Sequence, residues 1–68
     1  MTYTFKTEHG YQTEIVAETI VGAKRKATAL LAHGAGWVTL TTQDGEIYQR
    51  DFWQNGNRFG WDKWKRVF

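Results

Sequence analysis

The stretch Thr19–Gly34, TIVGAKRKATALLAHG, decides the fold, because it is the one segment of the sequence with a clear helical period. Thr19 offers a hydroxyl that can cap the first turn. Gly34 suits the left-handed position after a helix, and His33 beside it complements the negative pole. One helix is therefore expected over residues 19–34, with an apolar stripe that needs a second layer: Ile20, Ala23, Ala27, Leu30 and Leu31.

Alternating runs of aromatic and β-branched residues on both sides of this helix predict that second layer. Residues 3–8 and 11–17 alternate and are separated by His9-Gly10, which predicts a hairpin before the helix. The side chains expected to face inward from these two strands are Tyr3, Phe5, Thr7, Tyr11, Thr13, Ile15 and Ala17.

Three further runs follow the helix, at residues 37–42, 47–53 and 58–61. Asp44-Gly45 and Asn55-Gly56 separate them, and both dipeptides are strong signals for two-residue hairpin turns. The predicted fold is therefore α+β: an antiparallel sheet of about five strands with one helix packed on one face, in the order ββ-α-βββ. No structure is predicted for the basic and aromatic tail, residues 62–68.

Length and composition limit the chain further. With 68 residues it is expected to form one domain, residues 1–68. It contains no Cys, which excludes disulfides, thiol catalysis and thiolate metal sites. It has no apolar run long enough for a transmembrane helix, and its first residues do not resemble a signal peptide. The expected location is the cytoplasm.

The residues that catalysis would need are largely missing. Without Ser or Cys, the chain can form neither a Ser-His nor a Cys-His nucleophile pair. His9 and His33 fall in an expected turn and at an expected helix end, without a second ligand at metal spacing. The acidic residues alternate with apolar groups or fall in turns, as solvated residues do, and no phosphate-binding loop is present. We therefore expect no enzymatic activity, no metal and no cofactor.

Basic residues concentrate in the second part of the chain. Residues 24–68 carry eight basic against four acidic side chains, a net of +4, whereas residues 1–23 have a net of −2. The densest cluster is Lys24-Arg25-Lys26, in which Arg25 and Lys26 lie opposite the apolar stripe and Lys24 lies at its border. The outward positions near them are small: Gly22, Ala29 and Ala32. This pattern predicts a shallow surface that a partner could approach closely, while an ordinary solvated helix face explains the charges equally well.

Two more arginines, Arg50 and Arg58, lie among large rings in the later strands: Tyr48, Phe52, Trp53, Phe59 and Trp61. Basic groups among rings suit phosphate contacts and base stacking, and they suit protein interfaces as well. Some of these rings must be core, but aromatic residues are 16% of the chain and one helix cannot cover them all. The candidate partner-binding residues are Lys24, Arg25, Lys26, Arg50, Trp53, Arg58 and Trp61.

The segment Ile15–Ala27 followed by His33-Gly34 resembles a family of very small phage and mobile-element proteins. Its pattern is I-x-A-x-S/T-I/L-x-x-A-K-R-x-A, then His-Gly, two strands around a Gly turn and a final strand with Trp and basic residues. The best-known members are anti-CRISPR proteins that inhibit the type I-F surveillance complex. The resemblance covers roughly residues 13–64, and it implies an antiparallel sheet with one helix.

The resemblance also implies a function. Family members bind the effector subunits that hold the guide RNA and block pairing with target DNA, using basic helix positions and basic residues of the last strands. The matching positions here are Lys24, Arg25, Arg58 and Arg50. Residues 52–57 and the tail 64–68 depart from the pattern, which leaves another CRISPR type or another defence system open as the target.

Three functional hypotheses follow. The first is a phage-encoded inhibitor of a CRISPR effector in the host cytoplasm. The second is a small nucleic-acid-binding module that contacts DNA or RNA through its Lys, Arg and aromatic residues. The third is a structural protein that buries its spare rings in a homodimer, which is compatible with either of the other two.

Overall fold

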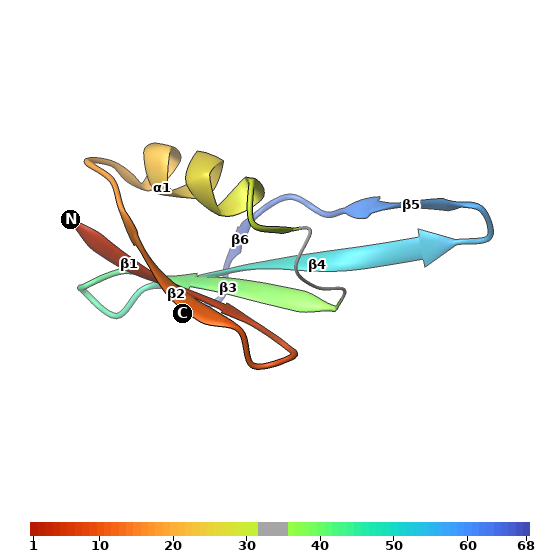
Figure 1. Ribbon diagram of the computed structural model, residues 1–68, viewed down its shortest axis with the longest axis horizontal. Helices are drawn as coiled ribbons and strands as arrows, with labels where there is room; N and C mark the ends of the chain where they lie inside the picture. The colour runs from red at the N-terminus through yellow and green to blue at the C-terminus, as the bar shows by residue number, and fades with distance from the viewer. Residues whose placement is uncertain (32–35) are drawn as a thin grey trace.

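The computed structural model describes residues 1–31 and 36–68. It confirms the α+β class: one helix lies on one face of an antiparallel sheet (Figure 1). In chain order the elements are β1 (Thr2–Thr7), β2 (Gln12–Val16), α1 (Ile20–Thr28), β3 (Trp37–Thr41), β4 (Ile47–Asn55), β5 (Arg58–Trp61) and β6 (Lys65–Arg66).

The strands are ordered β2-β1-β3-β4-β5, and β6 also pairs with β4. β3 occupies one edge of β4, where Trp37 lies opposite Asp51 and the N–H of Phe52 donates to the Gly36 carbonyl at 2.7 Å. β5 and β6 therefore share the other edge of β4. They are two parts of one edge strand, and the three residues 62–64 between them lie opposite the two residues 50 and 51 of β4. This one-residue excess is a β-bulge.

The core lies between α1 and the sheet face formed by β1, β2 and β3. The sequence correctly predicts most of its members, because alternate strand residues share a face. Tyr11 and Thr13 are exceptions. Tyr11, directly before β2, is exposed, although its ring meets Phe5 edge-on at 6.2 Å, and Thr13 is only half-buried. The buried residues are Tyr3, Phe5, Thr7, Ile15, Ala17, Ala23, Ala27, Leu31, Val38 and Leu40.

The helix begins as predicted but is shorter. Thr19 is the N-cap, and its hydroxyl accepts a hydrogen bond from the N–H of Gly22 at 3.1 Å. The helix ends at Thr28, after which the N–H of Leu30 donates to the Ala27 carbonyl at 2.9 Å, a tighter turn than α-helix makes. Leu31 is buried beyond this turn, whereas Leu30 is only half-buried. The predicted helix end at His33 and Gly34, and the outward position of Ala32, lie outside the described residues.

The first of the two later turns is longer than the two-residue turn predicted, and the second is a two-residue turn displaced by one residue. The first is a three-residue loop, residues 43–45, closed by a hydrogen bond from the Thr42 N–H to the Glu46 carbonyl at 2.9 Å. In the second, Asn55 pairs with Arg58, so the two turn residues are Gly56 and Asn57. Gly56 has a φ of +62°, a conformation that glycine adopts without strain. β4 consequently extends two residues past its predicted end at Trp53.

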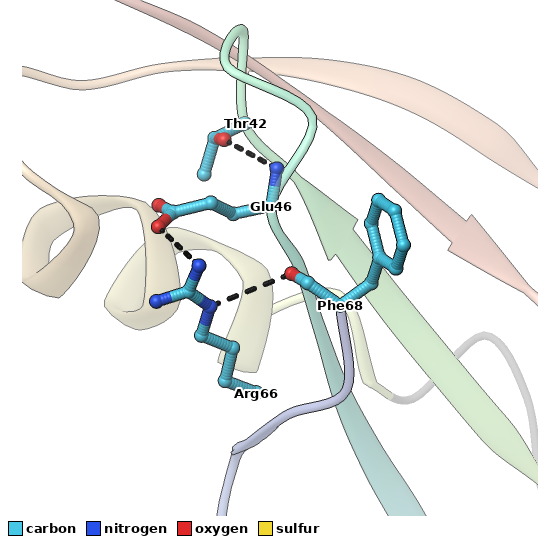
Figure 2. Close-up of polar contacts among 4 residues, drawn as sticks. All are labelled: Thr42, Glu46, Arg66 and Phe68. Atoms are coloured by element: carbon cyan, nitrogen blue, oxygen red, sulfur yellow. Dashed lines mark hydrogen bonds and ion pairs between the residues drawn. The ribbon is translucent and has the colours of Figure 1, made fainter.

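The chain end, for which no structure was predicted, adds the short strand β6. Arg66 holds it in place: its Nη2 lies 3.0 Å from Glu46 Oε2, and its Nε donates to the Phe68 carbonyl at 3.5 Å (Figure 2). The N–H of Glu46 is in turn bound to the Thr42 hydroxyl at 3.1 Å. These contacts tie the tail to the turn between β3 and β4.

Candidate partner-binding surface

The three basic residues of the helix occupy different environments. The Nζ of Lys24 lies over the Tyr48 ring of β4, 4.5 Å from its centroid, and Lys24 is half-buried, which agrees with its predicted place at the border of the apolar stripe. The Nζ of Lys26 donates to the carbonyl of Val16 at the end of β2. Arg25 is exposed and has no hydrogen bond or ion pair with any residue that the structure describes. Arg25 is therefore the member of this cluster most available to a partner.

Arg50 is engaged within the chain. From β4 its Nε donates to the carbonyl of Asp62 in the bulge, and its Nη1 donates to the Thr28 hydroxyl at 3.3 Å. Thr28 itself donates to the Lys24 carbonyl at 2.8 Å, at the end of α1. Arg50 thus joins the helix end, β4 and the bulge, which gives it a structural role; contact with a partner remains a prediction.

The part of the sheet that carries the other candidates extends away from the helix. β4 and β5 continue together as a two-stranded ribbon beyond the point where β3 begins (Figure 1). We call residues 52–61 the arm; the long axis of the molecule measures 39 Å, against 20 and 18 Å for the other two. One face of the arm carries a ring cluster, in which Phe52 lies 6.1 Å from Phe59 and 5.4 Å from Trp61 between centroids. Trp61 also packs against the core, but the ring of Phe59 is 69% exposed.

The other face of the arm carries Trp53 and Arg58. The indole of Trp53 covers Gly60 on β5, where an added Cβ would come within 3.0 to 3.3 Å of three indole atoms. Trp53 remains 41% exposed, and Arg58 at the tip is exposed as well. Trp37 of β3, opposite Asp51, shares this face and is 37% exposed. The Asp51 carboxylate between the two tryptophans accepts a hydrogen bond from Gln49 Nε2 at 2.9 Å.

The seven candidates therefore form two separate groups. Lys24, Arg25, Lys26 and Arg50 surround the helix and its end, while the other three belong to the arm, which points away from the helix (Figure 1). The candidate set omits two exposed rings that the structure places beside it, Trp37 and Phe59. Alternation along residues 37–41 already places Trp37 on the other face of the strand from Val38 and Leu40. Nothing in the local pattern distinguishes Phe59 from a core ring, because its exposure follows from the arm's extension past the helix.

Within residues 1–31 and 36–68 there is no pocket and no group of three or more His, Cys, Asp or Glu side chains that could hold a metal ion. No helix in these residues is long and apolar enough to cross a membrane. The candidate partner-binding surface consists of the exposed basic side of the helix and of the arm, which carries aromatic rings on both faces.

Comparison of the chain with protein-family models, with curated proteins and with solved structures found no match in any of the three.

Proposed function

We propose that this chain is a non-enzymatic inhibitor that binds a CRISPR effector complex in the host cytoplasm and blocks its binding to target DNA. The observation that carries the proposal is the segment Ala23–Ala27, A-K-R-x-A, on a helix whose Arg25 extends into solvent. Gly22 and Ala29 leave room around it, so a flat partner surface can reach the guanidinium. An exposed arginine with Gly22 and Ala29 beside it suits bidentate contact with carboxylates or phosphates of a nucleoprotein.

The proposal is tested by mixing the protein with purified effector complexes, beginning with the type I-F surveillance complex. Comigration on size exclusion and loss of the target-DNA mobility shift are expected. The helix is tested by Arg25→Glu, which should abolish inhibition without lowering the melting temperature. Lys24→Glu combined with Arg25→Glu should also abolish inhibition, but that pair removes the Lys24–Tyr48 contact and should lose about 0.5–1 kcal/mol of stability.

Lys6→Glu is the matched control for Arg25→Glu, because it makes the same charge change at an exposed position of β1. Its side chain follows Phe5 and precedes Thr7, which are both buried toward the helix, so it lies on the opposite face of the sheet. Inhibition should survive in this variant. Failure to bind any effector complex would refute the proposal, and unchanged inhibition by Arg25→Glu would remove the helix from the interface.

A second candidate function is direct binding of single-stranded nucleic acid. The observation that favours it is the position of Trp53, which rests on Gly60 and leaves its ring partly open beside Trp37 and Arg58. A ring supported on one side and open on the other suits base stacking. Fluorescent DNA and RNA oligonucleotides should then bind the isolated protein in a salt-dependent manner.

In that case Trp53→Ala should weaken oligonucleotide binding by about tenfold or more. Phe59→Ala is the matched control, since it removes a ring from the opposite face of the same arm. An inhibitor that acts only on the effector complex should show little oligonucleotide binding alone, which separates the two candidates.

A further inference from the structure

The outer edge of β5 is an open sheet edge. β5 ends the strand order, so only β4 pairs with it. The N–H of Asp62 donates to the Asp51 carbonyl of β4 at 2.8 Å, which shows that this residue's backbone groups face β4. Because backbone groups alternate in direction along a strand, those of Trp61 and Phe59 face away from β4. An open edge of this kind is a template for another strand.

The opposite edge of the sheet is partly covered. The chain runs from β2 into α1, and Lys26 of that helix binds the carbonyl of Val16. Charged side chains at an edge, and a helix or loop that covers it, both hinder pairing with another chain. No described residue makes such a contact with the outward backbone groups of Phe59 or Trp61. The two edges of the sheet therefore differ in their capacity to pair.

The sequence of the β5 edge is complementary to itself. Arg58 and Asp62 lie two residues to either side of Gly60, and both side chains are exposed. In an antiparallel pair centred on Gly60, Arg58 lies opposite the partner's Asp62. The same register places Phe59 opposite the partner's Trp61, so their outward backbone groups can exchange hydrogen bonds. Shifting the register by two residues, the smallest shift that keeps the outward backbone groups paired, loses the charge pair and sets Phe59 or Trp61 opposite its own copy.

We propose that two copies of this chain associate through β5, antiparallel about Gly60, to form one continuous sheet across the dimer. The pairing covers Phe59, the most exposed aromatic ring of the arm, with a ring of the second copy. The interface is isologous, as most dimer interfaces are, and it leaves the helix side with Arg25 open. The proposal does not depend on the proposed function, and it can hold whether or not the chain binds an effector complex.

The test is sedimentation velocity over a concentration series reaching millimolar protein. The wild-type chain should show a reversible monomer–dimer equilibrium. Arg58→Asp places two carboxylates opposite each other, and Asp62→Arg places two guanidinium groups opposite each other. Each should weaken dimerisation by at least about tenfold. An equal mixture of the two variants should recover the dimer, because every Asp then faces an Arg.

Arg25→Asp is the matched control: it makes the same charge change on the helix and should leave the dimer unaffected. Far-UV circular dichroism confirms that each variant is folded, and the Arg50 contact to Asp62 uses the backbone carbonyl, which Asp62→Arg retains. A wild-type chain that stays monomeric throughout would overturn the proposal. A dimer that persists in both single variants would overturn it as well, and so would an equal mixture of the two variants that stays monomeric. A chain that remains a monomer and binds oligonucleotides through its arm would also contradict the proposal.

Discussion

Replacing Arg50 by Met gives a direct measure of how much the arginine holds the fold together. The change removes the guanidinium bonds to the Asp62 carbonyl and the Thr28 hydroxyl but keeps an unbranched side chain on β4. A buried hydrogen bond from a charged donor contributes about 1.5–3 kcal/mol. Arg50 is only half-buried, so we take roughly half for each bond, about 2 kcal/mol in total. That loss should lower the melting temperature by roughly 8–16 °C in a domain of this size.

The matched control is Arg58→Met, since Arg58 is exposed and has no hydrogen bond or ion pair among the described residues. Its effect should stay within about 0.5 kcal/mol. Urea or thermal unfolding followed by circular dichroism measures both, and a double-mutant cycle with Thr28→Ala isolates the bond to the helix. Equal melting temperatures for the two arginine variants would refute the structural role of Arg50 and return it to the partner-binding candidates.

Four further substitutions test the packing and one surface ion pair. Leu40→Ala should lower the free energy of unfolding by about 2–5 kcal/mol, because Leu40 is fully buried. Leu30 is only half-buried, so Leu30→Ala should lower it by less than about 2 kcal/mol; chemical unfolding measures both. Gly60→Ala brings a Cβ to 3.0 Å from the Trp53 ring, so the indole should shift; a loss of about 1 kcal/mol and a displaced Trp53 indole N–H resonance are expected. Glu46→Gln removes an exposed ion pair, should lose less than about 1 kcal/mol, and should differ less from wild type as salt is added.

Short-range periodicity predicts much of this fold. Alternation places Phe5 on the inward face and sets Val38 and Leu40 together on one face of their strand, and the hydroxyl of Thr19 marks the start of the helix. These features depend on neighbours in sequence, which local pattern rules describe well. The helix end at Thr28 was not predictable in the same way, because it coincides with a contact from Arg50, which is distant in sequence.

The end of the chain could not be predicted for a similar reason. Trp61 and Trp64 are three residues apart, and strict alternation would place them on opposite faces of a strand. Both pack against the core, because the bulge at residues 62–64 turns Trp64 to the same face of the sheet as Trp61. For the candidate surface, sequence identifies the basic residues but not which of them other parts of the chain already engage. Lys24, Lys26 and Arg50 are engaged in this way, and Arg25 is not.

The position of the arm outside the core cluster also makes its tip a replaceable part. β6 pairs with Tyr48 and Gln49 of β4, on the far side of the bulge from the tip, so its pairing does not involve the tip residues. Inserting one residue in each strand at the tip would lengthen the arm by one pair and leave every core contact of Trp61 and Trp64 in place. The tip, residues 55–58, could therefore diverge in sequence or be exchanged for a binding loop of another specificity, while the same small core continues to fold beneath it.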